Sequence, residues 1–302
     1  MVDGDGGVVA SAGEPDTLIY PRSALKPFQA AASLEAIDPP PPTDEVALMT
    51  ASHTGSRTHQ AVVLRLLARA GLTPGALRCP HALPVDATAL RERPEPTRLA
   101  HNCSGKHAGF LLSTQQRGAD IRGHLATAAP VQRAVHRRLR DTCAAPPSGP
   151  GVDGCGAPAW RLPMVALARG FARLGQGQRL ARDDHHLAQV AVAMRTHPEL
   201  VGGPETVDTQ VMRADARVLA KRGAEATLAI AVRRDADAIG VAIKVSDGGA
   251  RALGPVAAAV LRPLGITVPV SLARPPVLGG GQPHGALEPA ADLVDALVPL
   301  SA

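Results

Sequence analysis

The sequence predicts an α+β fold, in which an antiparallel sheet is flanked by helices and a mostly helical lobe precedes the sheet. Amphipathic segments with helical spacing fill the first two thirds of the chain, whereas three consecutive strand patterns joined by short turns follow in the last third. The chain has 302 residues, 45% of them hydrophobic, which is enough to bury a substantial core.

The first elements are a short strand and two helices. Residues 8–10 (Val-Val-Ala) have a strand composition, and the Gly-Glu-Pro-Asp turn at 13–16 follows them. A helix is expected to begin near Ser23 and to stop before the four prolines at 39–42. The amphipathic pattern at 58–70, followed by Gly71, predicts the next helix.

Three further helices are expected at 129–142, 161–174 and 182–196, with a loop at 150–158 between the first two. Strands are expected at 218–220, 226–232 and 239–245, and because short turns join them they should be antiparallel. A helix at 250–264 and a loose Gly/Pro-rich tail from Pro275 complete the chain. We expect one domain over 1–302, with a helical lobe at about 56–200, the sheet and terminal helix at about 215–265, and the tail at about 275–302.

Charge and hydropathy limit the partners that the chain is expected to have. The net charge is +5 and the isoelectric point about 9.4. The arginines are spread over helical surfaces, and one Trp, one Tyr and three Phe offer little base stacking, so we expect no nucleic-acid partner. There is no apolar run of 18 residues and no signal peptide, which favours a cytoplasmic protein that binds no membrane.

Lysine is rare in this chain, and its positions are informative. Of 32 basic residues only four are lysine, and three of these lie in the short motifs Ser23-x-x-Lys26, Cys103-x-x-Lys106 and Lys221-x-Gly223. Since arginine serves wherever a permanent charge is needed, a retained lysine suggests a role that requires loss of a proton.

Ser23-x-x-Lys26 has the spacing of a nucleophile and its base. On a helix start, residues three apart lie on one face, so the Lys26 amine could reach the Ser23 hydroxyl. Lysine acts as a base only when burial or nearby positive charge lowers its pKa, and Lys221 could supply such charge. Together with Ser52 at a second helix entrance, these residues reproduce the three-element layout of Ser-Lys acyl hydrolases.

A second group could bind a metal. Cys103, Lys106 and Cys155 offer two thiolates and an amine, a donor set that suits Zn²⁺ with a fourth position left for water or another group. His101 and His107 are alternative ligands, and buried cysteines beside a structural lysine are the plainer interpretation.

Five motifs together resemble the signature blocks of the Rhizobium etli-type (class 3, inducible) L-asparaginase family, in order from about residue 5 to 265. They are Tyr-Pro-Arg-Ser-Ala-Leu-Lys-Pro-Phe-Gln at 20–29, Ala-Ser-His-Thr-Gly at 51–55, His-Asn-Cys-Ser-Gly-Lys-His-Ala-Gly at 101–109, Gly-Val-Asp-Gly-Cys-Gly at 151–156, and Ala-Lys-Arg-Gly-Ala-Glu at 220–225. The resemblance implies a serine β-lactamase/glutaminase-like fold, usually in a homodimer, that hydrolyses L-asparagine to aspartate and ammonia.

The resemblance also implies specific residues. It pairs Ser23 with Lys26 and Ser52 with Lys221, and it places zinc on Cys103, Lys106 and Cys155. Family members usually have one more strand before residue 8, and their segment after Lys221 is richer in glycine, so Lys244 is kept as an alternative to Lys221.

A free amino acid also needs partners for its two backbone charges. Arg22 or His53 could bind the α-carboxylate and Asp153 the α-ammonium, with Asn102 and Gly156 as further substrate-binding candidates in the same motifs.

Two alternatives to an asparaginase remain open at this point. One is another Ser-Lys hydrolase, such as a glutaminase, peptidase or β-lactamase relative. The other is a non-catalytic binding protein stabilised by zinc.

Overall fold

The computed structural model describes residues 1–235 and 237–297. Its helix-rich side is built around α1 (Lys26–Leu34), all nine residues of which are buried. Three longer helices pack against α1 and bury it: α5 (Ser104–Gln116), α6 (Pro130–Cys143) and α9 (His185–Thr196). The helices expected near Ser23, at 58–70 and at 129–142 are therefore confirmed, the second as α3 (Arg57–Arg69).

Shorter helices complete this side of the molecule: α2 (Thr43–Met49), α4 (Ala87–Glu92), α8 (Gly177–Asp183) and α10 (Pro198–Val201). Helix α11 (Val207–Ala214) packs instead against the first strand of the larger sheet. The helix expected at 182–196 is divided, with α8 ending at Asp183 and α9 beginning at His185. Because Asp184 caps α9 by accepting from the Leu187 N–H, the second helix starts there.

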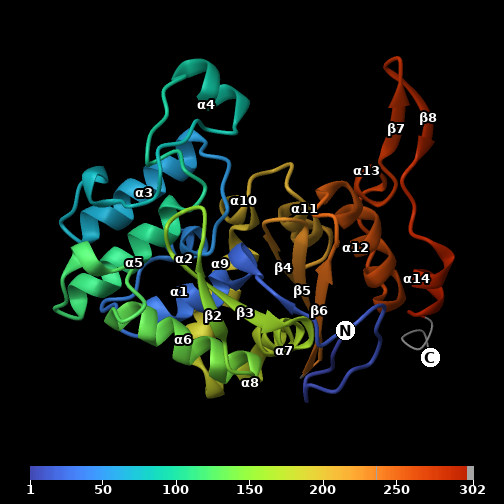
Figure 1. Ribbon diagram of the computed structural model, residues 1–302, viewed down its shortest axis with the longest axis horizontal. Coiled ribbons are helices and arrows are strands. Elements are labelled where there is room, and N and C mark those ends of the chain that lie inside the picture. Colours follow the sequence, from blue (N-terminus) through green and yellow to red (C-terminus); the bar gives the residue numbers. More distant parts are fainter. Residues whose placement is uncertain (236, 298–302) are drawn as a thin grey trace.

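The three predicted strands are confirmed as an antiparallel sheet in the order β4-β5-β6 (Figure 1), namely β4 (Val218–Gly223), β5 (Thr227–Arg234) and β6 (Asp237–Lys244). Helix α7 (Met164–Gly175) covers one face. It comes so close to β6 at Gly240 that a Cβ atom there would lie 2.0 Å from the Ala168 carbonyl oxygen. Strand alternation sends Val241 and Ile243 to the opposite face, toward α12 (Leu253–Leu261).

The terminal helix expected at 250–264 is present as three consecutive helical segments: η4 (Ala250–Ala252), α12 and η5 (Arg262–Leu264). Gly265 ends it in the left-handed region at φ 72°, as is typical of a helix C-terminus.

A second small sheet was not predicted. The expected loop at 150–158 contains the end of β2 (Ser148–Val152) and the start of β3 (Pro158–Pro163), and β3 also pairs with β1 (Leu18–Ile19). The helix expected at 161–174 consequently begins only at Met164. The glycines and prolines of this segment resemble a loop, but prolines are tolerated at strand ends and edges, where no ladder hydrogen bond is lost.

Both ends of the chain differ from expectation. Residues 8–10 form no strand: Val8 makes one isolated bridge with Val2, and Val2 makes another with Gly240. The tail expected to be loose from Pro275 forms the hairpin β7 (Pro276–Gly279) and β8 (Gln282–Ala286), followed by α14 (Ala291–Asp295); residues 298–302 lie outside the described residues. Gly280 and Gly281, both with positive φ, make the two-residue turn that closes this hairpin.

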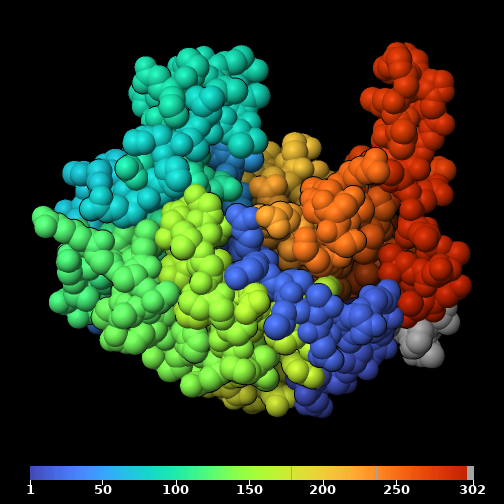
Figure 2. Space-filling view, in the orientation of Figure 1, coloured from blue at the N-terminus to red at the C-terminus, as the bar shows by residue number. Residues whose placement is uncertain are grey.

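The α+β class is thus confirmed, as helices beside small antiparallel sheets. Figure 2 shows that the segment around α4 and the β7–β8 hairpin project on the same side of the molecule, with a lower surface between them. None of the helices in residues 1–235 and 237–297 is long and apolar enough to cross a bilayer.

Candidate active site

A cavity of about 880 Å³ brings several of the predicted residues together. It is lined by Ser23 from the turn η1 (Arg22–Leu25), by Ser52 after α2, by Asn102 before α5, and by Arg222 at the end of β4. The start of α4 also contributes, through residues 85–88. We call this space the serine cavity.

The Ser23 segment is held in place by close packing. Arg22 adopts a left-handed backbone conformation at φ 51°, and the Ala24 N–H donates to the Pro21 carbonyl at 3.0 Å, which closes the turn before α1. Gly223 of β4 lies directly against it, since a Cβ atom there would be 2.3 Å from the Pro21 carbonyl oxygen. The strand and the serine turn therefore approach each other only because residue 223 is glycine.

Lys26 is fully buried, and its hydrogen bonds go to the second serine motif rather than to Ser23. Its Nζ donates to the Ala51 carbonyl at 2.5 Å and lies 3.0 Å from the Ser52 Oγ. Ala51 follows the end of α2, where carbonyl groups lack intrahelical partners and attract a cationic donor. The structure therefore joins Lys26 to Ser52, whereas the sequence predicted a contact between Lys26 and Ser23.

Burial favours the neutral form of Lys26. Removal from water lowers its pKa below the ordinary value, and the nearby charge of Lys106 lowers it further, although the Cys103 thiol acts in the opposite direction. An amine with a lowered pKa is more readily neutral, as a base beside a serine hydroxyl requires.

Lys221 is also fully buried, but its partner is a carboxylate. Its Nζ lies 3.0 Å from Asp208 Oδ2 and donates to the Arg222 carbonyl at 2.9 Å. Burial lowers the pKa of Lys221 to about 8, an effect that Asp208 opposes and the charge of Lys26 reinforces. The family resemblance implied a pair between Lys221 and Ser52, whereas the structure pairs Lys221 with Asp208.

Arg22 and Asp153, two of the expected substrate ligands, are paired with each other. Arg22 Nη2 lies 2.7 Å from Asp153 Oδ1, and Arg22 Nη1 lies 3.0 Å from Glu225 Oε1. The burial of Arg22 lowers its pKa, but the hydrogen bond and charge of Asp153 raise it more, so the net pKa is raised. Neither Arg22 nor Asp153 is among the residues that line the serine cavity.

Of the other expected substrate ligands, one lines the serine cavity and two do not. Asn102 is exposed and lines the serine cavity, whereas Gly156 is exposed in the β2–β3 turn at φ 84° and does not line it. His53 is buried, with its Nδ1 accepting from the Gly55 N–H and its Nε2 2.9 Å from Ser104 Oγ. Burial lowers the pKa of His53 well below its usual value, so this ring is neutral near pH 7 and offers no charge to a carboxylate.

The three predicted metal ligands meet in the core. Lys106 Nζ lies 3.0 Å from Cys155 Sγ, and Cys103, Lys106 and Cys155 are all buried. A hydrogen bond with Cys103 holds the pKa of Cys155 far below the usual thiol range, against the effect of burial. His107 lies beside Cys155, and burial lowers the pKa of this ring to about 4.

Cys103, Lys106 and Cys155 fit zinc in their chemistry, because two sulfurs and an amine are donors that Zn²⁺ accepts. In the described part of the chain, no three His, Cys, Asp or Glu side chains converge to form a metal site; here a lysine would be the third donor.

The family model for L-asparaginase II matches residues 1–289 of the chain. The protein belongs to the L-asparaginase II family. It is therefore an asparagine-hydrolysing enzyme, and the alternative of a non-catalytic binding protein is excluded. A search of curated proteins finds no match.

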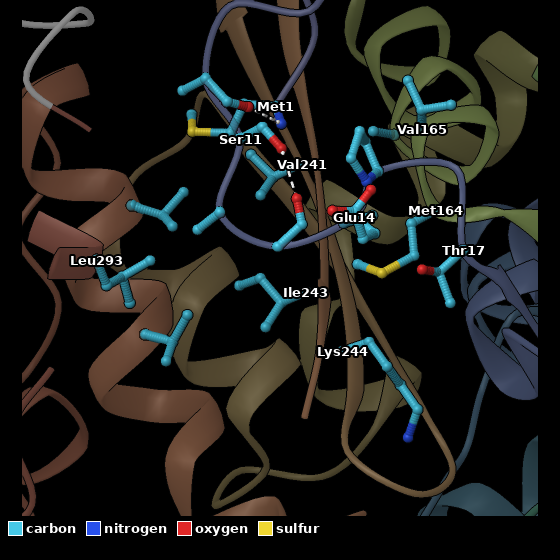
Figure 3. A pocket seen from close by; sticks show the side chains of 18 of the residues that line it. Met1, Ser11, Glu14, Thr17, Met164, Val165, Val241, Ile243, Lys244 and Leu293 are labelled. Carbon is cyan, nitrogen blue, oxygen red and sulfur yellow. Dashed lines mark hydrogen bonds between the residues drawn. The ribbon is translucent and has the colours of Figure 1, made fainter. Parts of the chain in front are cut away.

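A second cavity, of about 550 Å³, lies between the N-terminal segment, β6, α12 and α14 (Figure 3). Its wall is mainly apolar, with Met164, Val241, Ile243 and Leu293 facing the space, and we call it the apolar cavity. Lys244 lies at its edge, where its Nζ donates to the carbonyls of Glu225 and Val245. No serine contacts Lys244 through a described hydrogen bond, in contrast to Lys26.

Asp208 was missed by the sequence analysis. It lies on α11 and is completely buried, and its partners Lys221 and Arg222 come from β4. A usable signal existed, because Asp208 precedes Val211 and Met212 by three and four residues and so lies on the apolar face of that helix. A carboxylate on a buried face predicts a buried cation opposite it.

Proposed function

We propose that this member of the L-asparaginase II family hydrolyses L-asparagine to L-aspartate and ammonia through an acyl-enzyme on Ser23, with Lys26 as the base. One observation carries the proposal: the fully buried Lys26, whose pKa is lowered, lies 3.0 Å from the Ser52 hydroxyl, and Ser52 and Ser23 line the same cavity. Such a pairing of base and hydroxyl is what nucleophilic catalysis by serine requires.

In the proposed reaction, Ser52 passes the Ser23 proton to neutral Lys26, and the Ser23 oxygen attacks the side-chain amide carbon. The C–N bond then breaks, and Lys26 returns the proton to the leaving nitrogen, which departs as ammonia. Water hydrolyses the β-aspartyl ester with Lys26 again as base. The Ala24 N–H is already used in the turn, so the Ser23 N–H is the candidate donor to the oxyanion.

Ser52 is the second candidate nucleophile, because it is the serine that contacts Lys26. Its exposed fraction is 5%, lower than that of the half-buried Ser23, and we therefore assign Ser52 to proton transfer beside Lys26 and Ser23 to attack. Apo enzymes often lack the tight nucleophile–base contact that forms with substrate.

The experiment is an ammonia-release assay with L-asparagine on the wild type, Ser23→Ala and Ser52→Ala. Acid-quenched mixtures are then digested and analysed by mass spectrometry for a peptide carrying the β-aspartyl ester. We expect the ester on the 20–29 peptide and its loss in Ser23→Ala. An ester on Ser52 would exchange the two assignments, and selective hydrolysis of glutamine or a β-lactam would indicate a different Ser-Lys hydrolase.

Zinc would be held by Cys103, Lys106 and Cys155, and when bound it would order the motif loops beside the substrate. Ser23 supplies the nucleophile, so the chain's own residues carry the reaction. Removal of metal by a chelator should then raise KM for asparagine more than it lowers kcat. Zinc content before and after chelation, measured by atomic emission, checks that the metal was present.

The proposal also covers the fold, the cellular location and the oligomeric state of the enzyme. The α+β architecture is consistent with a serine β-lactamase/glutaminase-like fold in one domain, and the family resemblance favours a cytoplasmic homodimer. Sedimentation analysis tests the dimer, and superposition on a Ser-Lys hydrolase tests the fold.

A further inference from the structure

The substrate of the proposed reaction is a free amino acid, whose α-carboxylate needs a fixed cation near the serines. Among the described residues that line the serine cavity, Arg222 is the one with a positively charged side chain. We propose that Arg222 binds the α-carboxylate of the substrate and so sets the preference for amino acid amides over simple amides. This inference rests on the proposed asparaginase function.

Arg222 is held beside Ser52. Its Nη2 donates to the Ser52 carbonyl at 2.8 Å, so the guanidinium lies over the backbone of a serine that contacts Lys26. Its own backbone N–H donates to Asp208 Oδ2 at 3.2 Å, and its Nε lies 3.7 Å from Asp208 Oδ1. These contacts fix the side chain, while 32% of it stays exposed and available to a ligand.

The charge of Arg222 is not cancelled by its surroundings. Its one carboxylate partner, Asp208, is shared with the buried Lys221, so two cations face a single anion at this wall of the cavity. The burial of Asp208 raises its pKa, but the charges of Lys221 and Arg222 lower it more, and the carboxylate stays ionised. The group therefore keeps a net positive charge that suits an incoming carboxylate.

Arg22, which the sequence analysis named with His53 for this role, has the opposite balance of charges around it. Two carboxylates, Asp153 and Glu225, contact this one guanidinium, and Arg22 does not line the cavity. A carboxylate approaching Arg22 would have to displace an existing anion. Glu225 does line the cavity, together with Asp86 and Glu205, and these acids suit the α-ammonium group instead.

The test is a cycle of substrates and variants measured as kcat/KM. L-Asparagine is compared with 3-aminopropanamide, which is the same molecule without the α-carboxylate. Charge-assisted hydrogen bonds of this kind are worth about 10- to 100-fold, so the wild type should prefer asparagine by at least that factor. In Arg222→Gln, asparagine should lose that advantage, whereas Arg222→Lys should retain part of it.

Arg22→Gln is the matched comparison, and it should keep the preference ratio of the wild type. If Arg222→Gln keeps the ratio and Arg22→Gln loses it, the inference is overturned in favour of Arg22. If Arg222→Gln does not fold, the test uses Arg222→Lys. Its preference ratio and the thermal shift that L-aspartate induces in it are compared with those of the wild type. If neither is diminished, the assignment of Arg222 is overturned. A wild type that releases no ammonia from asparagine, yet gains thermal stability from L-aspartate only when Arg222 is present, would refute the proposed function and not the carboxylate site.

Discussion

The two cavities of this protein each have a lysine in or beside the wall, and their differences show what makes a lysine reactive. Lys26, beside the serine cavity, is completely buried, lies 3.0 Å from a serine hydroxyl, and has a lowered pKa. Lys244, beside the apolar cavity, is half-buried and donates to two backbone carbonyls. Both are among the four lysines of the chain, so their surroundings, rather than the residue type, decide which amine can act as a base.

The cavities also differ in how they are built. The serine cavity collects residues from seven separate segments and relies on buried charges, notably the Lys221–Asp208 pair. The apolar cavity is bounded by one face of β6 and the helices that cover it, and Glu14 and Lys244 are the charged residues among its lining. Charged networks are costly to leave half satisfied, whereas apolar walls tolerate small changes.

The sharpest test of this comparison is to change each lysine to arginine. Arginine keeps the charge but cannot lose its proton, so Lys26→Arg should reduce kcat/KM for asparagine by about 1,000-fold. Lys244→Arg should stay within about twofold of the wild type. Ammonia release measures both, and equal losses in the two variants would contradict the assignment of the base.

The next largest effect is expected at Asp208. Asp208→Asn leaves the buried Lys221 and the adjacent Arg222 without their carboxylate, and breaking a buried pair in this way costs about 3 kcal/mol of the free energy of unfolding. Asp215→Asn, which breaks the partly exposed pair with Arg217, is the control and should cost less than about 1 kcal/mol. Urea unfolding at pH 7 measures both, and similar costs would show that burial of the Asp208 pair adds nothing.

A smaller loss of stability is expected at acidic pH. Burial lowers the pKa values of His53 and His59 below the ordinary value, so the unfolded chain binds protons that the folded chain does not. The stability from these neutral rings is present above about pH 6.5 and is lost as the pH falls below it. The free energy of unfolding should therefore decrease from pH 7 to pH 5, and less steeply in His59→Gln. An unchanged slope in that variant would exclude His59 as a source.

Much of the fold followed from local patterns, because β4 to β6 carry β-branched residues in strand-length runs and the long helices carry apolar stripes. The β2–β3 and β7–β8 strands were missed, since their glycines and prolines match loop composition and pairing across the chain decides their conformation. The motifs identified most of the residues near the site. However, which lysine contacts which serine depends on packing between α1 and the end of α2, and no spacing in the sequence encodes that contact.

The smallest expected effect lies on the apolar side, and it tests whether the two cavities are independent. Ile243→Val removes one methylene group from the wall of the apolar cavity and should cost about 1 kcal/mol of stability, with kcat/KM unchanged. The two cavities are nevertheless linked through β6, because Lys244 holds the carbonyl of Glu225, and Glu225 also lines the serine cavity. A change of kcat/KM beyond twofold in Ile243→Val would therefore mean that packing at the apolar cavity affects the serine cavity through this contact. In a Lys244→Met background, which lacks the contact, Ile243→Val should then leave kcat/KM unchanged.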